Sequence, residues 1–501
     1  MKKASSQKPS TLLWKETIRY LIGIGFLTVV LLGLFFLFIR NYQSNKTIGS
    51  QSVIRVFPKN QVDRQKLLEL HYISRKDLKD SVLEFRGSFG DVRRLKKLGI
   101  PCALVAEADY NLSVRKNYPT VAQIQKKLFE LTQKYPQWTK LDTIGETAFY
   151  KKPILLIKLS DHPKKNQDKP AVLLMAGQHA REPVGTLFLL ALADSLLRAE
   201  GAHSSSSHFL QKEEIFIIPL VNVDGYSYLI KNHIKFPFWR KNLRDNNGDG
   251  AFSPAVDGVD LNRNYGFNWG DCADVDPKSW FYKGTQPFSE PETQAIRDLA
   301  RKRHFVWMID YHAYGQTVMF PWTKEIRPPD YEVLHQVALG YARRCRKYKN
   351  HRHYEVFPLN GKTGQSANWF YAKFRTLGFI VKLGTEYFPP QKEVDFVVRQ
   401  NLKSVKYLLN RVFQTGIEGR ITDRTSGMPV SAIVQIQNDF SPVVAPLRSD
   451  STFGHYWRIL FPGDYTVSFQ AENFKTVVRK IHISRGEHKI LNIQMIPTDK
   501  S

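Results

Sequence analysis

The sequence predicts an α/β protein: a three-layer α/β/α sandwich with a mixed sheet, preceded by a small α/β domain and followed by a β-sandwich. Between residues 117 and 413, apolar runs of strand length alternate with amphipathic stretches of helix length. Such alternation is typical of a buried sheet with helices on both faces. From residue 416 to 497 the hydrophobic period changes to that of half-buried strands. A chain of 501 residues is long enough for about three domains.

The central domain, residues 117–413, has the clearest pattern of strands and helices. Its expected elements are a helix over 121–135, strands over 154–159 and 172–176, a helix over 185–199, strands over 215–221 and 305–311, and a closing helix with apolar positions from Val394 to Val412. Ligands of open α/β sheets bind at the carboxyl ends of the strands. Polar side chains that follow these strands are therefore the candidate functional residues.

Residues 52–109 are predicted to form a separate small domain. Short apolar runs and helical stretches alternate there as well: a strand over 52–57, a helix over 61–70, a strand over 81–86, a helix over 90–98 and a strand over 101–105. Turn residues separate these segments, as expected for short α/β units.

Two strands of the central domain end in residues that bind zinc in other proteins. His179 and Glu182 follow the apolar run 171–176, and His312 closes the run 305–311. Catalytic zinc takes three such ligands and leaves one coordination position open. A single histidine after a strand is more often a capping or core residue, and a zinc site is favoured here only together with the residues that lie between these candidates.

The residues between these ligands occur in the order found in a known family. The segments are Asn222 to Tyr226, Trp239 to Asn242, Val259 to Asn264, Tyr282 to Gly284 and Pro287 to Thr293. With the ligands, they resemble the zinc metallocarboxypeptidases of the pancreatic A/B type over roughly residues 117–412. The resemblance implies the α/β/α carboxypeptidase fold and one Zn²⁺ bound by His179, Glu182 and His312.

The same resemblance assigns residues to the substrate. Asn262 and Arg263 match the pair that grips a C-terminal carboxylate, with Arg181 as a further cationic contact. Guanidinium binds carboxylate through two parallel hydrogen bonds, which suits this role. Arg240 matches the residue that polarises the scissile carbonyl and stabilises the oxyanion.

The position of the general base departs from the family. Members carry a glutamate on a late strand, and here the aligned residue is Lys382. A protonated lysine cannot accept a proton, and loss of a general base costs ~10²–10⁴ in rate. Glu386, four residues on, is a candidate substitute, but it lies about 13 Å along a strand unless Gly384 marks a bulge. A neutral Lys382 acting as the base is a third alternative.

The residues that line the substrate pocket also differ from the family pattern. Phe357 stands nearest to the position of a mobile tyrosine that closes over substrate, so the hydroxyl is missing; Tyr354 or Tyr371 are alternatives. Ala367 matches the position that sets side-chain preference, and Asn368 replaces the usual acid beside it. An acidic selector for basic C-terminal residues is absent at Ala367, and the preference stays open.

A second metal site is weakly indicated by the oxygen-rich run Asp245 to Asp249. The spacing is that of a calcium loop, but Val256 stands where the full pattern needs a bidentate glutamate. Clusters of Asn, Asp and Gly more commonly form turns. A turn is therefore favoured over calcium.

The flanking domains also resemble modules of the same family. Residues 52–109 are similar to the N-terminal pro-like domains of bacterial members, and a structural spacer is the equally weighted alternative. Residues 416–497 are similar to the transthyretin-like domain of the carboxypeptidase N/E branch. No catalytic constellation occurs in the latter segment, so packing or partner docking is its expected role.

The N-terminus predicts attachment to a membrane. Residues 20–39 are uncharged and apolar, long enough to cross ~30 Å of hydrocarbon. The basic tail 1–19 precedes them, which places the N-terminus in the cytoplasm and the domains in the periplasm or outside the cell. The lipid bilayer is thus an expected partner. Three widely spaced cysteines cannot form a disulfide framework, although they leave room for one pair.

The formal net charge of +27 favours acidic partners. No nucleic-acid motif occurs, so nucleic acid is not an expected ligand.

Two functions remain. The favoured one is a membrane-anchored zinc carboxypeptidase that removes C-terminal residues from peptides or wall stems with a free carboxylate. The alternative is a non-catalytic relative that binds C-termini, which Lys382 and Phe357 favour.

Overall fold

The computed structural model describes residues 52–56, 58–69, 83–87, 89–104, 118–201, 208–231, 238–272, 274–322, 327–359 and 363–498. The chain divides into two compact units, residues 1–107 and 108–501. The predicted tail 1–19 and membrane anchor 20–39 lie outside the described residues. Within the described ranges, no helix has the length and apolar character needed to cross a membrane.

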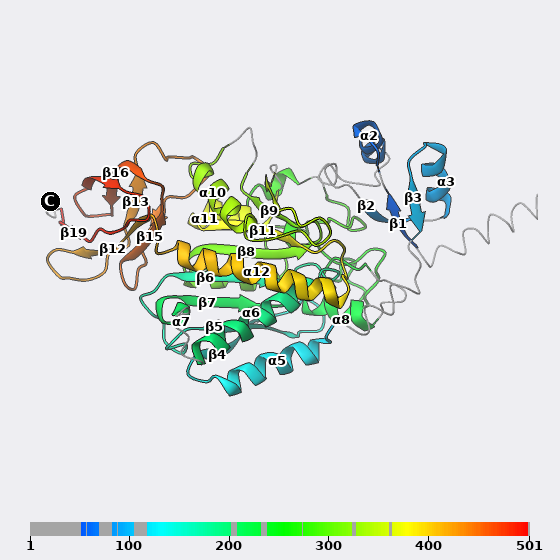
Figure 1. Ribbon diagram of the computed structural model, residues 1–501, viewed down its shortest axis with the longest axis horizontal. Coiled ribbons are helices and arrows are strands. Elements are labelled where there is room, and N and C mark those ends of the chain that lie inside the picture. Colours follow the sequence, from blue (N-terminus) through cyan, green and yellow to red (C-terminus); the bar gives the residue numbers. More distant parts are fainter. Residues whose placement is uncertain are drawn as a thin grey trace, which may run out of the picture. The chain divides into compact units, whose positions relative to one another are not determined.

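The first unit contains a small antiparallel sheet and two helices (Figure 1). Its elements are β1 (Ser52–Val56), α2 (Gln61–Glu69), β2 (Leu83–Gly87), α3 (Phe89–Lys97) and β3 (Cys102–Leu104). The sheet order is β2-β1-β3. Ile54 and Val56 of the central strand share a buried core with Leu67 of α2 and Leu95 of α3. Every element expected over residues 52–105 is present, with ends that differ from the expected ones by at most two residues.

The second unit is built on an eight-stranded sheet in the order β10-β9-β11-β8-β6-β7-β5-β4. The strands are β4 (Thr139–Glu146), β5 (Pro153–Leu159), β6 (Ala171–Ala176), β7 (Glu214–Ile218), β8 (Phe305–Ala313), β9 (Thr317–Phe320), β10 (Glu355–Pro358) and β11 (Leu377–Leu383). The central strands β7, β6, β8 and β11 are parallel, and β5 and β9 pair antiparallel with β7 and β11. The predicted mixed sheet is confirmed.

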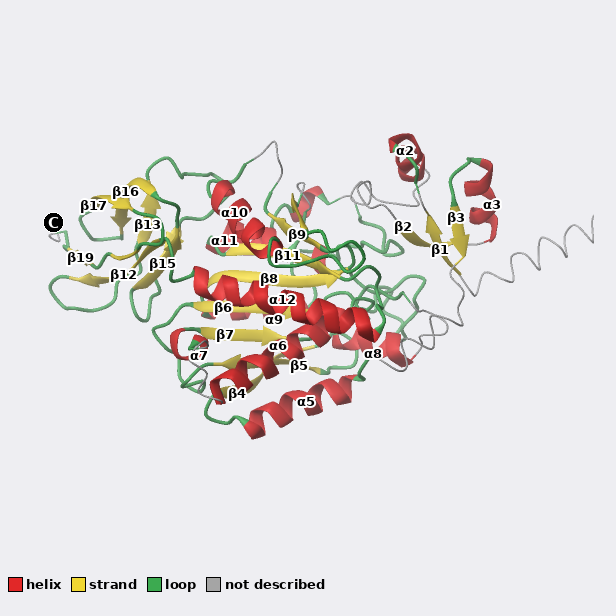
Figure 2. Cartoon of the chain, in the orientation of Figure 1, coloured by secondary structure: helices red, strands yellow, loops and turns green. Residues whose placement is uncertain are grey.

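Helices cover this sheet, and the central strands β6 and β7 are buried along their whole length. The helices are α5 (Val121–Lys134), α6 (Val184–Gly201), α7 (Phe209–Lys212), α8 (Val223–Lys231), α9 (Pro291–Lys302), α10 (Tyr331–Ala342), α11 (Ser366–Phe374) and α12 (Gln391–Arg411). In Figure 2, α5, α6 and α12 cross one face of the sheet side by side. Strands without exposed residues need cover on both faces, as the layered architecture requires.

The C-terminal segment forms two small sheets packed around their own core. Its strands are β12 (Gly416–Asp423), β13 (Ile433–Ile436), β14 (Leu447–Arg448), β15 (His455–Ile459), β16 (Gly463–Gln470), β17 (Val477–Ile483), β18 (His488–Ile490) and β19 (Ile493–Met495). One sheet has the order β15-β12-β18, with β19 also paired to β12, and the other has the order β14-β13-β16-β17. Buried residues such as Ile421, Val434 and Phe469 lie between them. The predicted β-sandwich is confirmed.

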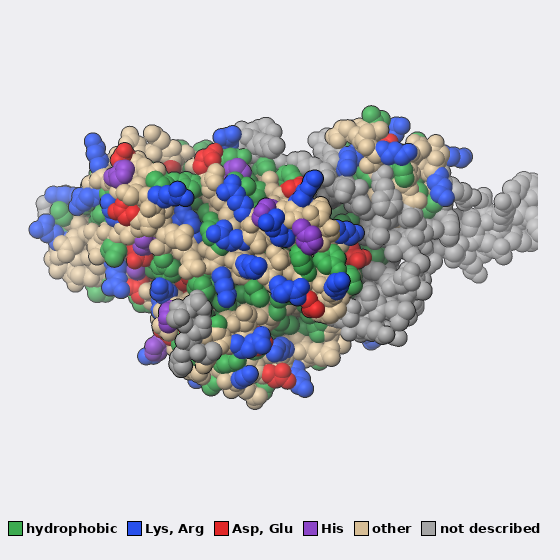
Figure 3. All heavy atoms as spheres, in the orientation of Figure 1, with side chains coloured by type: hydrophobic (Ala, Val, Ile, Leu, Met, Phe, Trp, Pro, Cys, Tyr) green, Lys and Arg blue, Asp and Glu red, His purple; other side chains and the backbone are tan. Residues whose placement is uncertain are grey.

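Basic side chains are scattered over the surface. In Figure 3, Lys and Arg side chains lie across the visible face of the second unit, and fewer Asp and Glu side chains lie among them. The excess charge is therefore distributed over this face.

Candidate metal centre

The chain turns sharply at the carboxyl end of β6 and delivers two candidate ligands. Gly177 has φ +69°, and a Cβ there would lie 2.6 Å from Leu220 Cδ1, so the turn requires glycine. Asn222 N donates to Gly177 O at 2.9 Å and fixes the turn. Glu182 N then donates to His179 O at 3.1 Å. The local fold thus brings His179 and Glu182 together just before α6 begins.

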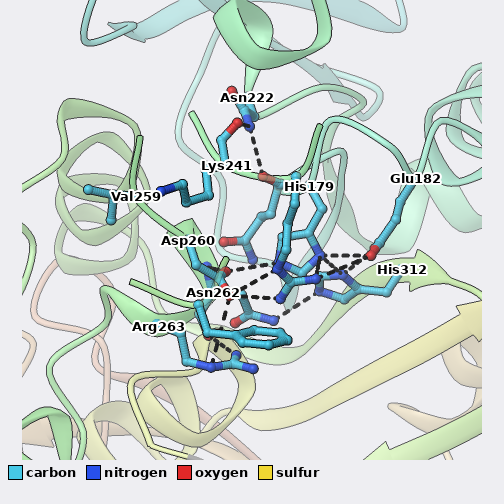
Figure 4. A network of polar contacts seen from close by, with 12 residues as sticks. His179, Glu182, Asn222, Lys241, Val259, Asp260, Asn262, Arg263 and His312 are labelled. Atoms are coloured by element: carbon cyan, nitrogen blue, oxygen red, sulfur yellow. Dashed lines mark hydrogen bonds and ion pairs between the residues drawn. The ribbon is translucent and has the colours of Figure 1, made fainter. Parts of the chain in front are cut away.

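His312, near the end of β8, meets these two residues. Its Nδ1 lies 3.0 Å from His179 Nδ1 and 2.7 Å from Glu182 Oε2, while Glu182 Oε1 lies 2.9 Å from His179 Nδ1. One ligand atom from each residue falls within 4.8 Å of the others, and all three side chains are buried. Figure 4 shows them converging from separate segments. Two imidazole nitrogens and one carboxylate are a donor set that zinc accepts.

The outer nitrogen of each histidine contacts a buried carboxylate. His179 Nε2 lies 3.0 Å from Asp260 Oδ1, and His312 Nε2 lies 2.9 Å from Asp310 Oδ2. Asn262 Nδ2 is also 3.0 Å from His312 Nε2. Metal-binding histidines ordinarily donate their second N–H to a carboxylate such as Asp260 or Asp310, so that the other ring nitrogen can bind the metal. The residues present therefore fit a zinc ion.

Burial and neighbouring charges set the protonation of the cluster. Burial lowers the pKa of His179, and Arg240 lowers it further. Burial alone would lower the pKa of His312, but Asp310 and Glu182 outweigh it and raise the value to about 9. Burial opposes ionisation of Glu182, yet the two histidines hold its pKa well below the usual value. Glu182 is therefore available as an anionic ligand.

Arg240 is a fixed cation beside the candidate ligands. Its Nε and Nη2 donate to Asp260 Oδ2 at 3.0 and 2.7 Å, and its Nη1 lies 3.6 Å from Glu182 Oε1. Burial disfavours the charge, but Asp260 and Glu182 raise the pKa of the guanidinium. The backbone of Arg240 is tied to the ligand loop, because its carbonyl accepts from Ala180 N at 3.1 Å. Arg240 can therefore stabilise negative charge on an oxygen at the metal.

Asn262 and Arg263 lie in the 3₁₀ turn Leu261–Arg263, which Asp260 caps through Asn262 N at 3.0 Å. Asn262 Oδ1 accepts from Ser366 N at 2.9 Å. Arg263 Nη1 donates to Asn262 O at 2.6 Å. Only 2% of Asn262 and 3% of Arg263 is exposed. The predicted carboxylate clamp therefore lies directly beside the metal ligands.

Aromatic rings pack on the arginines of the site. Phe281 stands 5.2 Å from the Arg240 guanidinium and 5.6 Å from that of Arg263, measured to the ring centre. Both distances are within the range of cation–π attraction. The ring therefore holds both guanidinium groups in place.

Arg181, the third predicted cationic contact, lies between two rings. Its guanidinium is 4.4 Å from the centre of Tyr387 and 5.2 Å from that of Trp280. Its Nη1 also donates to Phe238 O at 3.5 Å. These contacts place Arg181 in an aromatic wall.

The helix α11 carries the predicted selectivity position. Ser366, its first residue, donates through Oγ to Asp310 Oδ2 at 2.7 Å. Ala367 is completely buried, and a Cβ at Gly378 of β11 would lie 2.4 Å from Ala367 O. No acidic side chain stands at Ala367, and the wall behind it is filled by the sheet.

Phe357 lies on β10, an edge strand that β9 and β11 separate from β8. It pairs with Met319 and is half-buried. The two alternative tyrosines are engaged in the core: Tyr371 donates to Asp330 Oδ2 at 2.9 Å, and Tyr354 Oη accepts from Asn401 Nδ2 at 3.4 Å. Their hydroxyl groups therefore already have partners in the fold.

Lys382 lies beside a metal ligand. In the parallel pairing of β11 and β8, it stands opposite His312. Paired residues on neighbouring strands project from the same face of a sheet, so the lysine and histidine side chains share one face. Lys382 is half-buried, and its ammonium group has no hydrogen bond or ion pair within the described part of the chain.

Glu386, the suggested substitute base, lies beyond the end of that strand. The register of β11 with β8 is continuous from Leu377 to Leu383, and Gly384, the suggested bulge position, follows the end of the strand with φ +66°. The chain leaves the sheet at Gly384, and Glu393 anchors the next residue by accepting from Thr385 N at 2.6 Å. Within the described residues, Glu386 is not a member of the metal-binding group.

The segment Asp245 to Asp249 forms a hydrogen-bonded turn. The Asp245 carboxylate accepts from Gly248 N at 2.7 Å and from Gly250 N at 2.9 Å. These bonds lower the pKa of Asp245. The contacts are those of the turn that the sequence favoured over a calcium site.

Sequence reasoning missed several residues of the site. Asp310 stands two residues before His312, and strand alternation alone would have placed both on one face. The rings of Trp280, Phe281 and Tyr387 come from loops, where no periodic signal exists. Only the fold brings them to the arginines.

Comparison with known proteins agrees with this geometry. Residues 124–404 match the zinc carboxypeptidase family, and residues 416–496 match the carboxypeptidase regulatory-like domain. The chain therefore belongs to the zinc carboxypeptidase family. It carries a C-terminal regulatory-like domain.

Individual relatives include proteins named as enzymes and proteins named as inactive. Carboxypeptidase B2 of Bos taurus is 33% identical, over 45% of this chain and 52% of that protein. Inactive metallocarboxypeptidase ecm14 of Schizosaccharomyces pombe is 28% identical, over 51% of this chain and 54% of its own. The chain thus spans about half the length of each.

Solved structures show the same fold. Thrombin-activatable fibrinolysis inhibitor aligns with TM-score 0.61 and 24% identity, over 72% of this chain and 98% of that one. The bovine protein in complex with tick carboxypeptidase inhibitor aligns with TM-score 0.51 and 26% identity, over 60% of this chain and 97% of that one.

Proposed function

We propose that this chain is a zinc protein that binds peptides by their C-terminal carboxylate and hydrolyses the terminal bond inefficiently. The observation that carries the proposal is the pairing of Lys382 with His312 at the position where the family has its glutamate base. His179, Glu182 and His312 supply the metal site, and Asn262 with Arg263 supplies the carboxylate clamp. Binding residues are thus kept while the proton acceptor is lost.

The chemistry divides between binding and proton transfer. A zinc ion held by the two histidines and Glu182 would act as a Lewis acid toward a peptide carbonyl. Asn262 and Arg263 orient the terminal carboxylate, and Arg240 stabilises negative charge that develops on the carbonyl oxygen. Removal of a proton from the attacking water needs a base, and a cationic Lys382 cannot accept that proton.

Hydrolysis by a zinc carboxypeptidase is the second candidate, and the sequence alone favoured it. The complete ligand set and the buried Arg240 support this function, because they form the electrophilic half of a carboxypeptidase site. Similarity to carboxypeptidase B2 supports it as well. Glu386, or an uncharged Lys382, would then have to supply the base.

The proposed setting is a membrane surface outside the cytoplasm. The apolar segment 20–39 would anchor the chain in the lipid bilayer, with the basic tail 1–19 in the cytoplasm. The ligands would be extracytoplasmic peptides or wall stems with a free C-terminal carboxylate.

To distinguish hydrolysis from binding, amino-acid release and peptide affinity are both measured on the full chain, purified in detergent. We expect one zinc per chain and binding of free-carboxylate peptides but not of their C-terminal amides. Amino-acid release should be negligible in the wild type and should rise ~10²-fold or more in Lys382→Glu, because a general base is restored. Zinc content and circular dichroism serve as folding controls.

The hydrolytic alternative makes the opposite prediction. Efficient release by the wild type would contradict the proposal. Loss of that release in Glu386→Gln, with zinc retained, would identify Glu386 as the base. Loss of amino-acid release in Lys382→Met but not in Glu386→Gln would identify Lys382 as the base.

A further inference from the structure

The charges around the candidate ligands are unbalanced once a metal is bound. The acids in contact with the two histidines are Glu182, Asp260 and Asp310, and the bases beside them are Arg240, Arg263 and Lys382. Three acids offset three bases, so a divalent cation leaves two positive charges. Arg181 adds a further positive charge in the aromatic wall. A peptide with only its terminal carboxylate neutralises this site in part.

Lys382 differs from Arg240 and Arg263 in having no acidic partner among the described residues, and Arg181 of the aromatic wall likewise forms no ion pair there. Arg240 lies 2.7 Å from Asp260, and Arg263 lies 4.0 Å from the same carboxylate. Lys382 has no such partner within the described residues. A half-buried ammonium beside a metal is unfavourable until an anion joins it. The ligand itself is the natural source of that anion.

Two groups that can bind an anion therefore lie close to His312. Asn262 Nδ2 lies 3.0 Å from His312 Nε2, with Arg263 adjacent in sequence. Lys382 is paired with His312 on the neighbouring strand, at the ~4.8 Å separation of paired strands. The aliphatic part of the Lys382 side chain passes Gly315. A Cβ added at Gly315 would lie 3.4 Å from Lys382 Cδ, so the glycine leaves the lysine unobstructed at this point.

Neither Ala367 nor Asp310 offers a free acid to a basic terminal residue. Ala367 supplies no charge, and Asp310, which Ser366 of α11 contacts, is already occupied by Ser366 Oγ at 2.7 Å and His312 Nε2 at 2.9 Å. A basic side chain at this place would also be repelled by the cation of Lys382.

We propose that Lys382 makes the site selective for peptides that end in glutamate or aspartate. This inference rests on the proposed carboxylate-binding function and names its ligand class. The terminal α-carboxylate lies at Asn262 and Arg263, and the side-chain carboxylate pairs with Lys382. Lysine in place of the family's glutamate at position 382 thus removes the general base and adds a second anion-binding group to Asn262 and Arg263.

The test compares matched peptides that differ only in the last residue: Glu, Gln, Leu or Lys, each with a free carboxylate. Binding to the zinc-loaded full chain is measured by fluorescence anisotropy at fixed ionic strength. We expect the Glu peptide to bind about tenfold more tightly than the Gln peptide, the size of one added charge-assisted contact. Lys382→Met should bring that ratio to about one.

Controls separate charge from fold. Lys382→Arg keeps the cation and should keep the preference, whereas Lys480→Met removes an exposed lysine of β17 and should leave it unchanged. Zinc content confirms that each variant retains the site. Equal binding of Glu and Gln peptides by the wild type overturns the inference, and so does a preference that survives Lys382→Met.

The proposed function fails by a different result. A Gln peptide that binds equally well as its C-terminal amide would show that the free carboxylate is not recognised. A free-carboxylate requirement with no preference for glutamate would leave the proposed function standing and remove only the role of Lys382.

Discussion

Asp310 connects three parts of the candidate site through one carboxylate. Its Oδ2 lies 2.9 Å from His312 Nε2, accepts from Ser366 Oγ at 2.7 Å and also accepts from Gln178, the neighbour of His179. The side chain is completely buried. Such an acceptor fixes both the ring orientation and the tautomer of a metal-binding histidine. Asp310 is therefore expected to act as a positioning residue.

Replacing Asp310 with asparagine should weaken zinc binding without unfolding the chain. The amide keeps the shape of the carboxylate but loses the charge that supports the His312 N–H, so zinc affinity should fall by about 10- to 100-fold. Competition with a chromophoric chelator measures the change. Asp249→Asn, in an exposed turn, is the matched control. Unchanged affinity in Asp310→Asn would rule out the positioning role.

The residues of the site differ in how readily the sequence identifies them. His179, Glu182 and His312 follow apolar runs, so their place at strand ends could be predicted. Lys382 could be aligned, but its register with His312 depends on how β11 pairs. Trp280 reaches Arg181 from a loop, and long-range packing alone determines such contacts.

At the scale of elements, the 3₁₀ turn with Arg263 is held against the start of α11. Gly364, just before the helix, has φ +64°, and a Cβ there would lie only 2.1 Å from Arg263 O. Gly364 O accepts from Tyr265 N at 3.1 Å, and Gly364 N donates to Phe267 O at 2.9 Å. The turn Leu261–Arg263 and the start of α11 are thereby held side by side, which fixes the carboxylate clamp relative to Ala367 of α11.

Gly364→Ala should disturb the clamp as well as the local turn. Any non-glycine residue at positive φ costs on the order of 1 kcal/mol, and the clash with Arg263 adds to that cost. Gly427→Ala is a matched control, since Gly427 has φ +73° with open space around it. The thermal unfolding temperature and the peptide affinity should both fall more in Gly364→Ala than in Gly427→Ala. Equal effects in the two variants would show that backbone strain alone matters.

Element prediction succeeded where burial is strong. The expected strand 172–176 is β6, Ala171–Ala176, and the expected strand 305–311 is β8, Phe305–Ala313. The sequence argument left β4, β9 and β10 unassigned. β4 is an edge strand with mostly half-exposed residues, and β9 and β10 have four residues each, so none of the three produces a strong apolar pattern.

At the scale of the molecule, buried ion pairs join the C-terminal sandwich to the central domain. Asp330 Oδ2 accepts from Arg375 Nε at 2.8 Å, and Asp330 Oδ1 accepts from Arg458 Nη2 at 3.0 Å. Both arginines also pair with Asp439 of the sandwich. Removing one member of such a network leaves charges without partners. The network therefore specifies how the two domains pack.

Acid should weaken this packing, and Asp330→Asn should remove much of the effect. Burial disfavours ionisation of Asp330, but Arg458 and Arg375 outweigh it and lower its pKa. A carboxyl group with a lowered pKa stabilises the fold fully above its unfolded pKa near ~3.9, and that stability is lost as pH falls below this value.

Thermal unfolding between pH 7 and pH 2 measures the effect. At pH 7, Asp330→Asn should be less stable by about 3 kcal/mol, and the difference from wild type should shrink as the solution is acidified below about pH 4. Asp464→Asn, which removes the acid of an exposed pair with His482, should follow the wild type. A constant difference across the pH range would exclude Asp330 as the titrating group.

The helix α11 has a partner at each end. Its first residue, Ser366, binds Asp310 beside the metal ligands, while Ala372 O near its last turn accepts from Ala445 N of the C-terminal segment at 2.7 Å. Nine residues of α-helix span about 13 Å, so a single rigid element reaches from the sandwich to the pocket. The two domains should therefore evolve together. If the C-terminal sandwich were exchanged for that of a homologue, α11 would need matching changes. Recombination between Arg411 and Gly416, which would separate the two domains, should therefore be disfavoured.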